Sequence, residues 1–406
     1  MKEYYSLQEF SSLIGKSKET LRRWDNSGKL TAVREPISNY RIYKKDQLNL
    51  FEELNLVNKN TQNNQIVPLK NYKVLELFAG AGGLAIGLEQ AGLKCVALNE
   101  LDKWASETLR NNRPNWNVIE DDIRNVNFTQ YANKVDVVTG GFPCQSFSYA
   151  GKKLGLNDAR GTLFYEFARV VKETKPKICI GENVRGLLNH DHGKTLQGMI
   201  SVLDEIGYNV VDPRVLKAIY YNVPQKRERL ILVGIRKDVQ VDYEYPLPNE
   251  NVYSLKDALK KGELYDTDVP LSRGPEYPQR KKEIIELVPP GGYWRDLPLD
   301  LQKEYMQKSF YLGGGKTGIA RRISWDEPCL TLTCSPAQKQ TERCHPDETR
   351  PFKVREYARI QTFPDDWNFA GSLSQQYKQI GNAVPVNLAK ELGYSIIKFL
   401  NKLNQQ

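Results

Sequence analysis

Cys144 stands where a nucleophile could work. It follows Val135–Thr139, a β-branched run that predicts a short buried strand, and Pro143 fixes the backbone just before it. The thiol is therefore expected at the carboxyl edge of an open α/β sheet, where ligands bind. A thiol that is held still and partly exposed there suits nucleophilic catalysis. An isolated Pro-Cys pair is more often an ordinary turn with a structural cysteine, so the rest of the chain must decide.

A glycine turn offers a second chemical feature. The expected elements are a strand over Tyr72–Phe78, a turn over Ala79–Leu84 and a helix from there to Ala91. The missing side chains of Gly80, Gly82 and Gly83 let a ligand approach the backbone. Their Gly-x-Gly-Gly spacing is not the dinucleotide pattern Gly-x-Gly-x-x-Gly, which weakens a phosphate-binding interpretation.

Two acids follow further predicted strands. Glu100 ends the strand at Cys95–Leu98, lies 20 residues beyond Gly80, and can accept hydrogen bonds from both hydroxyls of a ribose. Asp122 ends the strand at Val118–Ile123 and can accept from an adenine amino group. A glycine turn and two strand-end acids suit an adenosyl group without a pyrophosphate, so we expect S-adenosylmethionine. Each feature alone occurs in many α/β folds.

The N-terminal 50 residues predict a separate DNA-binding unit. Ser6 and Glu9 have the spacing of a capping box before a first helix, Gly15 ends that helix, and a second helix follows from Ser17 to Trp24. With a strand at Tyr40–Tyr43, the pattern resembles the winged helix-turn-helix of MerR-type regulators. The second helix carries Arg22 and Arg23, which we expect to bind DNA, and residues 1–48 have a net charge of +4. The alternative is a small helical protein-interaction domain.

Composition excludes several classes of protein. The chain has 406 residues and a net charge of +9, which weakly favours a polyanionic partner. It has no run of about 18 apolar residues, so no membrane partner is expected. The first residues lack the apolar core of a signal peptide. We therefore expect a cytoplasmic, nucleoid-associated protein with reduced cysteines.

Seven motifs, in order, resemble those of the DNA (cytosine-5) methyltransferases, from Tyr72 to about Lys398. They lie at residues 78–83, 141–145, 160–164, 182–184, 225–229, 355–364 and 379–385. The resemblance implies an α/β, Rossmann-like methyltransferase domain that uses S-adenosylmethionine, with a small target-recognition domain and the added helix-turn-helix.

The resemblance also implies catalytic roles. Cys144 would add to carbon 6 of cytosine, which makes carbon 5 nucleophilic toward the methyl donor. Glu182, which follows a further predicted strand at Lys177–Gly181, would bind ring nitrogen 3 and the exocyclic amine. Arg229 would hold oxygen 2, and Arg227 would orient Glu182 and the loop. Because Cys144 cannot reach a base inside a duplex, the target must be flipped out.

The other expected site residues follow the same motifs. At the cofactor we expect Phe78, Gly80, Gly82, Gly83, Leu84, Glu100, Asp122, Ile123, Pro143, Leu163, Asn382 and Ala383. At DNA we expect Gln145 and Ser146, besides the two N-terminal arginines, and residues 146–155 should form a loop that closes on DNA. No metal is expected, because Cys329, Cys334, Cys344 and His345 match no compact zinc pattern.

The predicted domains are as follows. Residues 1–50 form the winged helix-turn-helix, 51–70 an Asn-rich linker, 71–240 the catalytic domain, 241–365 the target-recognition domain, and 366–406 the return to the catalytic domain. The stretch from Val241 to Arg350 has a net charge of −2, so phosphate attraction must come from local clusters or from the large domain.

Three functions stay open. The first is a modification methylase of a restriction-modification system, with double-stranded DNA and a cognate endonuclease as partners. Its helix-turn-helix would repress its own promoter or simply raise DNA affinity. The second is an RNA cytosine-5 methyltransferase, and the third is a DNA-binding regulator whose methyltransferase half is only a scaffold.

Overall fold

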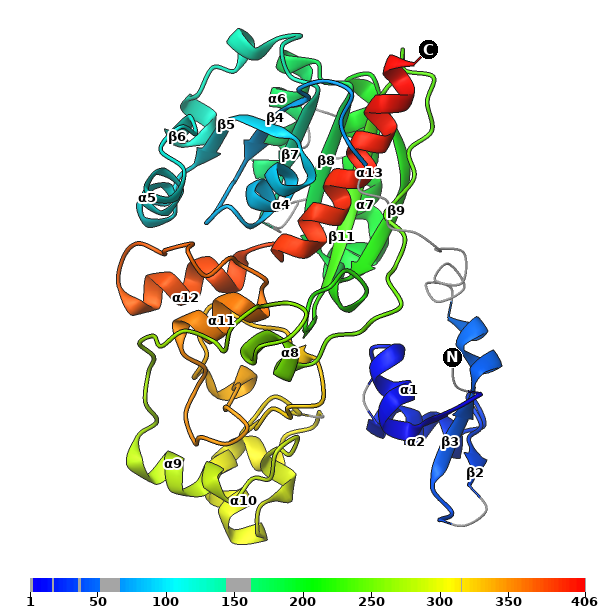
Figure 1. Cartoon of the computed structure of the whole chain (residues 1–406), viewed down its shortest axis with the longest axis vertical. Helices are drawn as coiled ribbons and strands as arrows, with labels where there is room; N and C mark the ends of the chain where they lie inside the picture. Colours follow the sequence, from blue (N-terminus) through cyan, green and yellow to red (C-terminus); the bar gives the residue numbers. More distant parts are fainter. Residues whose placement is uncertain are drawn as a thin grey trace.

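The computed structural model describes residues 3–16, 18–35, 38–51, 66–143, 162–314 and 316–405. Figure 1 shows a large sheet domain, a small domain below it that carries α9 and α10, and an N-terminal unit that lies beside α8. Helices α11 and α12 lie between the large and the small domain.

The large domain contains a mixed sheet that, within the described residues, has seven strands. In spatial order they are β6 (Val118–Glu120), β5 (Lys94–Glu100), β4 (Lys73–Leu77), β7 (Val137–Gly140), β8 (Ile178–Val184), β11 (Glu228–Arg236) and β9 (Tyr208–Lys217). The first five are parallel, whereas β11 is antiparallel to both β8 and β9. The strand order reverses between β4 and β7, and a ligand is expected in the crevice at their carboxyl ends.

The predicted strands are confirmed for all five parallel members of the sheet. The antiparallel pair β9 and β11 was not predicted. Strand β9 carries charged side chains and alternates only in part, which gives a weak strand signal, whereas the apolar run Leu230–Ile235 of β11 is typical of a buried strand and was overlooked.

Helices cover both faces of the sheet. One face packs against α4 (Gly83–Ala91) and α13 (Val386–Asn404), and the other against α6 (Leu163–Thr174) and α7 (Lys194–Glu205). Strand side chains alternate accordingly, since Val74 joins the first apolar cluster and Leu75 the second. A further helix of this domain, α5 (Lys103–Asn112), follows β5. This is a doubly wound, three-layer α/β architecture.

The small domain has its own apolar core, which runs from Tyr277 to Cys344 and includes Trp294 and Met306. Its elements are short: α8 (Leu255–Leu259), α9 (Gln279–Glu286), α10 (Leu299–Met306) and the two-residue pair β10 (Gln225–Lys226) and β12 (Cys329–Leu330). The chain then returns through α11 (Val354–Ile360) and α12 (Leu373–Asn382). Short 3-10 helices are η1 (Lys45–Leu50), η2 (Ile123–Asn125), η3 (Thr129–Tyr131), η4 (Arg185–Gly193), η5 (Ala218–Tyr220), η6 (Trp294–Asp296), η7 (Gln307–Tyr311) and η8 (Lys339–Thr341).

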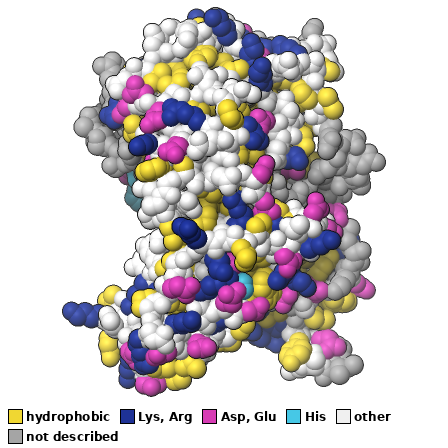
Figure 2. Space-filling view, turned by 60° about the vertical axis from the view of Figure 1, so that its left-hand side comes forward, with side chains coloured by type: hydrophobic (Ala, Val, Ile, Leu, Met, Phe, Trp, Pro, Cys, Tyr) yellow, Lys and Arg dark blue, Asp and Glu magenta, His cyan; other side chains and the backbone are white. Residues whose placement is uncertain are grey.

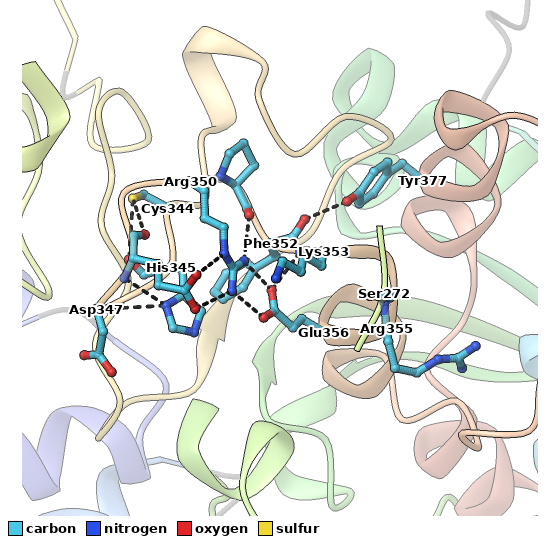
Figure 3. Close-up of polar contacts among 12 residues, drawn as sticks. Ser272, Cys344, His345, Asp347, Arg350, Phe352, Lys353, Arg355, Glu356 and Tyr377 are labelled. Atoms are coloured by element: carbon cyan, nitrogen blue, oxygen red, sulfur yellow. Dashed lines mark hydrogen bonds and ion pairs between the residues drawn. The ribbon is translucent and has the colours of Figure 1, made fainter. Parts of the chain in front are cut away.

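A buried polar cluster joins the small domain to α11, as Figure 3 shows. The guanidinium of Arg350 donates to both oxygens of Glu356 at 2.8 and 2.7 Å, and to Glu348 at 2.8 and 2.9 Å. Tyr377 of α12 donates to the Phe352 carbonyl at 2.7 Å. Removing one partner of a buried charge pair is strongly destabilising, so this cluster holds the small domain against α11 and α12.

The N-terminal unit contains α1 (Leu7–Leu13), α2 (Lys18–Asn26) and an antiparallel sheet in the order β1 (Tyr4–Ser6), β3 (Arg41–Lys44), β2 (Val33–Arg34). Both predicted helices and the predicted strand at β3 are confirmed. Ser6 and Glu9 form the expected capping box, with 2.8 and 3.2 Å hydrogen bonds. Gly15 turns the chain between the helices at a φ of +65°, which favours glycine. The assignment to the MerR type stays a prediction.

Within the described residues, no helix is both long enough and apolar enough to cross a membrane.

Candidate active site and cofactor cavity

A cavity of about 790 Å³ opens at the carboxyl edge of the sheet. The turn after β4, the ends of β5, β7 and β8, and the segments 331–334 and 378–384 form its walls. Its position is the reversal of strand order noted above, and its volume falls within the range of small-molecule sites.

The structure brings most of the expected cofactor residues together in this cavity. Eleven of the twelve line it: Phe78, Gly80, Gly83, Leu84, Glu100, Asp122, Ile123, Pro143, Leu163, Asn382 and Ala383. Gly82 does not. A Cβ there would lie 2.8 Å from Leu109 and 3.1 Å from Trp367, and its φ is +88°. Gly82 therefore shapes the start of α4 and permits close packing instead of facing the cavity.

Glu100 is set against the glycine turn. Its two carboxyl oxygens accept from the backbone N–H groups of Gly80 and Asp102, each at 2.7 Å. Burial raises the pKa of Glu100, and these two hydrogen bonds act in the opposite direction. Each oxygen keeps a second lone pair, so the side chain can still accept from a ligand hydroxyl.

The carboxylate of Asp122 already accepts hydrogen bonds within the protein, which its expected role does not require. Its carboxylate accepts from the Arg124 guanidinium at 2.9 and 2.6 Å and from the Arg124 backbone N–H at 3.0 Å. These bonds to Arg124 lower the pKa of Asp122. Both residues line the cavity. An adenine amino group would therefore share Asp122 with Arg124.

Glu76 is a cavity residue that sequence reasoning missed. It lies in β4 with 1% of its surface exposed, and its Oε2 has no hydrogen-bond partner among the described residues. Burial, reinforced by the charge of Glu100, raises the pKa of Glu76 to about 8. An unpaired buried oxygen is costly, so its presence beside a cavity points to a ligand donor. The available signal was an acid inside the apolar run Val74–Phe78.

Glu182 and Arg229 form an ion pair on the same cavity wall. The Arg229 Nε lies 2.5 Å from Glu182 Oε1, and both side chains are 11% exposed. The antiparallel pairing of β8 with β11, in which Ile231 faces Glu182 across the ladder, sets this contact. Glu182 Oε1 makes no aligned hydrogen bond within the described residues, so it can still accept one from a ligand.

The loop after β7 is held close to Glu182. Asn183 Nδ2 donates to the Phe142 carbonyl at 2.9 Å, and a Cβ on Gly141 would lie only 3.0 Å from Glu182 Oε2. A side chain at Gly141 would crowd the carboxylate. This loop ends, among the described residues, at Pro143, which also lines the cavity.

Arg227 has different partners from those expected. It was expected to orient Glu182, but Arg229 occupies that place, and the Arg227 guanidinium donates to the carbonyls of Leu332 at 3.2 Å and Gly381 at 3.0 Å. The chain turns at Arg227 between β10 and β11, since its N–H bonds the carbonyl of Gln225 at 2.8 Å. Burial lowers the pKa of Arg227 to about 9, and the Arg229 charge adds to this. Arg227 thus joins two segments of the cavity wall.

Several expected residues lie outside the described part of the chain. These are Cys144, Gln145 and Ser146, together with the loop at residues 146–155. Arg22 and Arg23 are described, and both are exposed on α2, away from this cavity. Arg22 forms a 3.0 Å ion pair with Glu19.

The residues raised as zinc candidates are not gathered in one place. Cys334 lines the cavity and donates to Asn382 Oδ1 at 2.9 Å, whereas Cys329 and Cys344 are buried elsewhere. His345 Nδ1 accepts from backbone N–H groups, as Figure 3 shows. Within the described residues, no group of three or more metal-ligating side chains is placed to hold an ion.

Other wall residues carried no recognisable sequence signal. Thr331–Cys334 reach the cavity from the small domain, and Lys378 of α12 pairs with Asp102 at 2.7 Å. These segments lie more than 100 residues from the strand ends that they meet. Only the tertiary fold brings them there.

The doubly wound sheet carries a cavity where its strand order reverses, and a glycine turn and several acids line that cavity. These features define the class: a Rossmann-like, S-adenosylmethionine-dependent methyltransferase. Residues 72–398 match the family model described as C-5 cytosine-specific DNA methylase, and the chain belongs to that family. It is a DNA (cytosine-5) methyltransferase whose methyl donor is S-adenosylmethionine.

Individual relatives extend the match beyond this region. The chain is 62% identical over 409 residues to the Type II methyltransferase M.Eco47II of Escherichia coli, which covers 100% of this chain and 98% of the relative. It is 58% identical over 402 residues to M.PspPI of Psychrobacter sp. (strain TA137), covering 98% and 97%. Both alignments include the N-terminal unit, which precedes the family match.

Solved structures support the fold alone. A crystal structure of Spodoptera frugiperda DNMT2 superposes with a TM-score of 0.58 at 18% identity and covers 80% of this chain and 99% of that one.

Proposed function

We propose that this chain is the modification methyltransferase of a Type II restriction-modification system, and that it methylates carbon 5 of one cytosine in a short duplex sequence. The two relatives above, which share its full length, are both named Type II methyltransferases. The observation that carries the proposal is the Glu182–Arg229 pair, preset on the wall of the cavity that the glycine turn also lines.

The pair suits a flipped-out cytosine. Glu182 can accept from the exocyclic amine and, when its carboxyl carries a proton, donate to ring nitrogen 3, and Arg229 can donate to oxygen 2. Because both side chains are almost buried, these polar contacts exclude water and gain strength from the low local dielectric. The fixed ion pair needs little reorganisation when the base arrives.

Cys144 is assigned as the nucleophile from its place after Pro143. Its thiolate adds to carbon 6 of cytosine, and the electron pair released at carbon 5 attacks the methyl group of the donor. The carbon–carbon bond forms as the methyl–sulfur bond breaks, and that bond's electron pair stays on sulfur. Loss of the carbon 5 proton to water then expels the thiolate and restores the aromatic ring. The base must leave the duplex for this addition, and the loop at 146–155, with Gln145 and Ser146, is assigned to DNA closure.

S-adenosylmethionine fits the remaining part of the cavity. When bound, it supplies an electrophilic methyl group. Glu100 would accept from the ribose hydroxyls, Asp122 from the adenine amine together with Arg124, and the unpaired Glu76 Oε2 from a donor on the cationic portion. A Cβ on Gly80 would have no described atom within 4 Å, so the ligand has room to approach the backbone closely there.

The small domain is assigned to sequence recognition in the major groove. On the face seen in Figure 2, Lys/Arg and Asp/Glu side chains are interspersed over the lower part of the molecule, so that part presents no uniform basic surface. Direct hydrogen bonds to base edges therefore suit this domain better than bulk phosphate attraction.

The paired Glu182 and Arg229 argue against the scaffold alternative, and the high identity to Type II methyltransferases argues against an RNA substrate.

The Cys144→Ser variant tests the mechanism. A hydroxyl is far less ionised than a thiol near neutral pH, so methyl transfer to duplex DNA should fall at least about a thousandfold while DNA binding persists. Transfer of a labelled methyl group to DNA and a mobility-shift titration measure the two properties.

The Ser374→Ala variant, which removes an exposed hydroxyl that does not line the cavity, is the matched control. Substantial turnover by Cys144→Ser would show that Cys144 is not the nucleophile.

A further inference from the structure

The N-terminal unit is docked on the catalytic domain. Tyr220 Oη donates to the Leu13 carbonyl at 2.6 Å, and a Cβ on Gly15 would lie 2.8 Å from Ile219 Cδ1. Phe10 and Ile14 of the unit belong to the same apolar cluster as Ile219 and Tyr220. The turn between α1 and α2 therefore packs against η5, in the connection from β9 to β11.

An ion cluster adds a second link. Glu327, just before β12, lies 3.5 Å from Lys18 Nζ of α2 and 3.1 Å from Lys226 Nζ of β10. Glu327 and Lys226 are each 14% exposed, so the cluster is largely shielded from solvent. The attraction of the two lysines outweighs the effect of burial and lowers the pKa of Glu327 to about 2. The carboxylate thus stays charged and bridges the unit to the strand that precedes Arg227.

The docked unit forms one wall of a second hollow, of about 610 Å³, which we call the basic cleft. Its walls carry eight basic and four acidic side chains. Lys16, Lys18 and Arg22 come from the N-terminal unit, Arg185 and Lys217 from the catalytic domain, and Arg321 from the small domain. Each of the three parts of the chain therefore contributes positive charge.

The basic cleft adjoins the cavity that holds Glu182. Arg227 lines both, and Arg185 follows directly on β8, the strand that carries Glu182. A duplex carries one negative charge per about 1.7 Å of helix axis, so basic side chains that adjoin the cavity for the target base are suited to contact the neighbouring phosphates.

We infer that the N-terminal unit is a fixed wall of the substrate-DNA channel, and that Lys16 and Arg22 contact phosphates of the same duplex that carries the target cytosine. The inference rests on the proposed function for the identity of that duplex. It differs from the operator-binding role expected from the sequence, because Arg22 lines the basic cleft, which adjoins the cavity that holds Glu182. Arg23, its neighbour on α2, is exposed but does not line the cleft.

The neighbouring arginines provide a matched test. The full-length double variant Lys16→Ala/Arg22→Ala should raise the KM for substrate duplex about tenfold with little change in kcat. The plot of log Kd against log salt should become less steep by about 1.8, the equivalent of two phosphate contacts. Arg23→Ala/Lys29→Ala removes the same charge from exposed positions of the unit that do not line the cleft, and should leave both quantities unchanged.

The outcomes separate the hypotheses. An unchanged KM and salt slope in the first variant, or an equal effect in the control, would overturn the inference. Operator binding instead predicts that Arg22 and Arg23 matter equally for promoter DNA and not for substrate DNA. The salt slope is measured by binding alone, so it remains informative even if the wild-type chain transfers no methyl group to DNA. Equal thermal unfolding midpoints in all variants confirm that folding is intact.

Discussion

At the scale of single residues, the carboxyl of Glu76 stands out because it is buried at the cavity and one of its oxygens has no hydrogen-bond partner among the described residues. With a pKa of about 8 it is mostly protonated at neutral pH in the free protein. A cation bound nearby favours the ionised form, so the pKa falls and a proton is released on binding.

We therefore expect the affinity for S-adenosylmethionine to rise with pH, by up to about tenfold per unit, until the pH passes about 8. Calorimetric titration at pH 6.5, 7.5 and 8.5 measures this affinity. The amino group of the ligand titrates in the same range, so Glu76→Gln is the reference, and its pH profile should be flatter. Identical profiles for the two proteins would remove Glu76 from the cofactor site.

Glu100 and Asp122 should differ in their effect on the cofactor. Glu100→Gln replaces a carboxyl that can still accept hydrogen bonds from ligand hydroxyls. We therefore expect the KM for S-adenosylmethionine to rise about 10- to 100-fold. Asp122→Asn should raise it only about threefold, because Arg124 already occupies most of that carboxylate.

Neither substitution should lower kcat much, since both acids lie where they would bind groups remote from the transferred methyl. Steady-state kinetics with saturating DNA supplies the two constants. A larger effect at Asp122 than at Glu100 would show that the engagement by Arg124 does not persist in the complex.

At the scale of elements, the parallel strands and the helices that follow them could be predicted, because β-branched runs and glycine turns are local signals. The strand-end acids Glu100 and Glu182 follow from those strands. The pairing of Glu182 with Arg229 could not be predicted from the sequence. It depends on the register of the antiparallel strands β8 and β11, which joins segments about 50 residues apart. Glu76 was missed because alternation in a strand does not reveal which side faces a cavity.

The two arginines beside the break between β10 and β11 should separate stability from catalysis. Arg227→Ala leaves the buried carbonyls of Leu332 and Gly381 without donors, so we expect a loss of about 3 kcal/mol and a lower Tm. Arg229→Ala should reduce kcat at least about a hundredfold with a smaller fall in Tm, because it removes the partner of Glu182 at the site of the base.

Differential scanning fluorimetry and methyl-transfer kinetics on the same preparations compare them. If Arg227→Ala is as stable as the wild type and Arg229→Ala is as active, the division of roles drawn from their contacts is wrong.

At the scale of the whole molecule, three parts meet around the two adjoining hollows. The catalytic sheet supplies the cavity, the small domain closes it through residues 331–334, and the N-terminal unit packs on η5. The presence of an N-terminal unit with two helices and a strand at β3 could be predicted from capping and periodicity. Its docking could not, since contacts such as Tyr220 with Leu13 join residues 207 positions apart.

Methylation of carbon 5 of cytosine in duplex DNA is tested most directly by bisulfite sequencing of a plasmid from cells that express the full chain, in a host without other cytosine methylation. We expect protected cytosines at one fixed position of one short recurring sequence, and none when Cys144→Ser is expressed. A plasmid left unprotected at every site by folded, abundant wild-type protein would contradict this function.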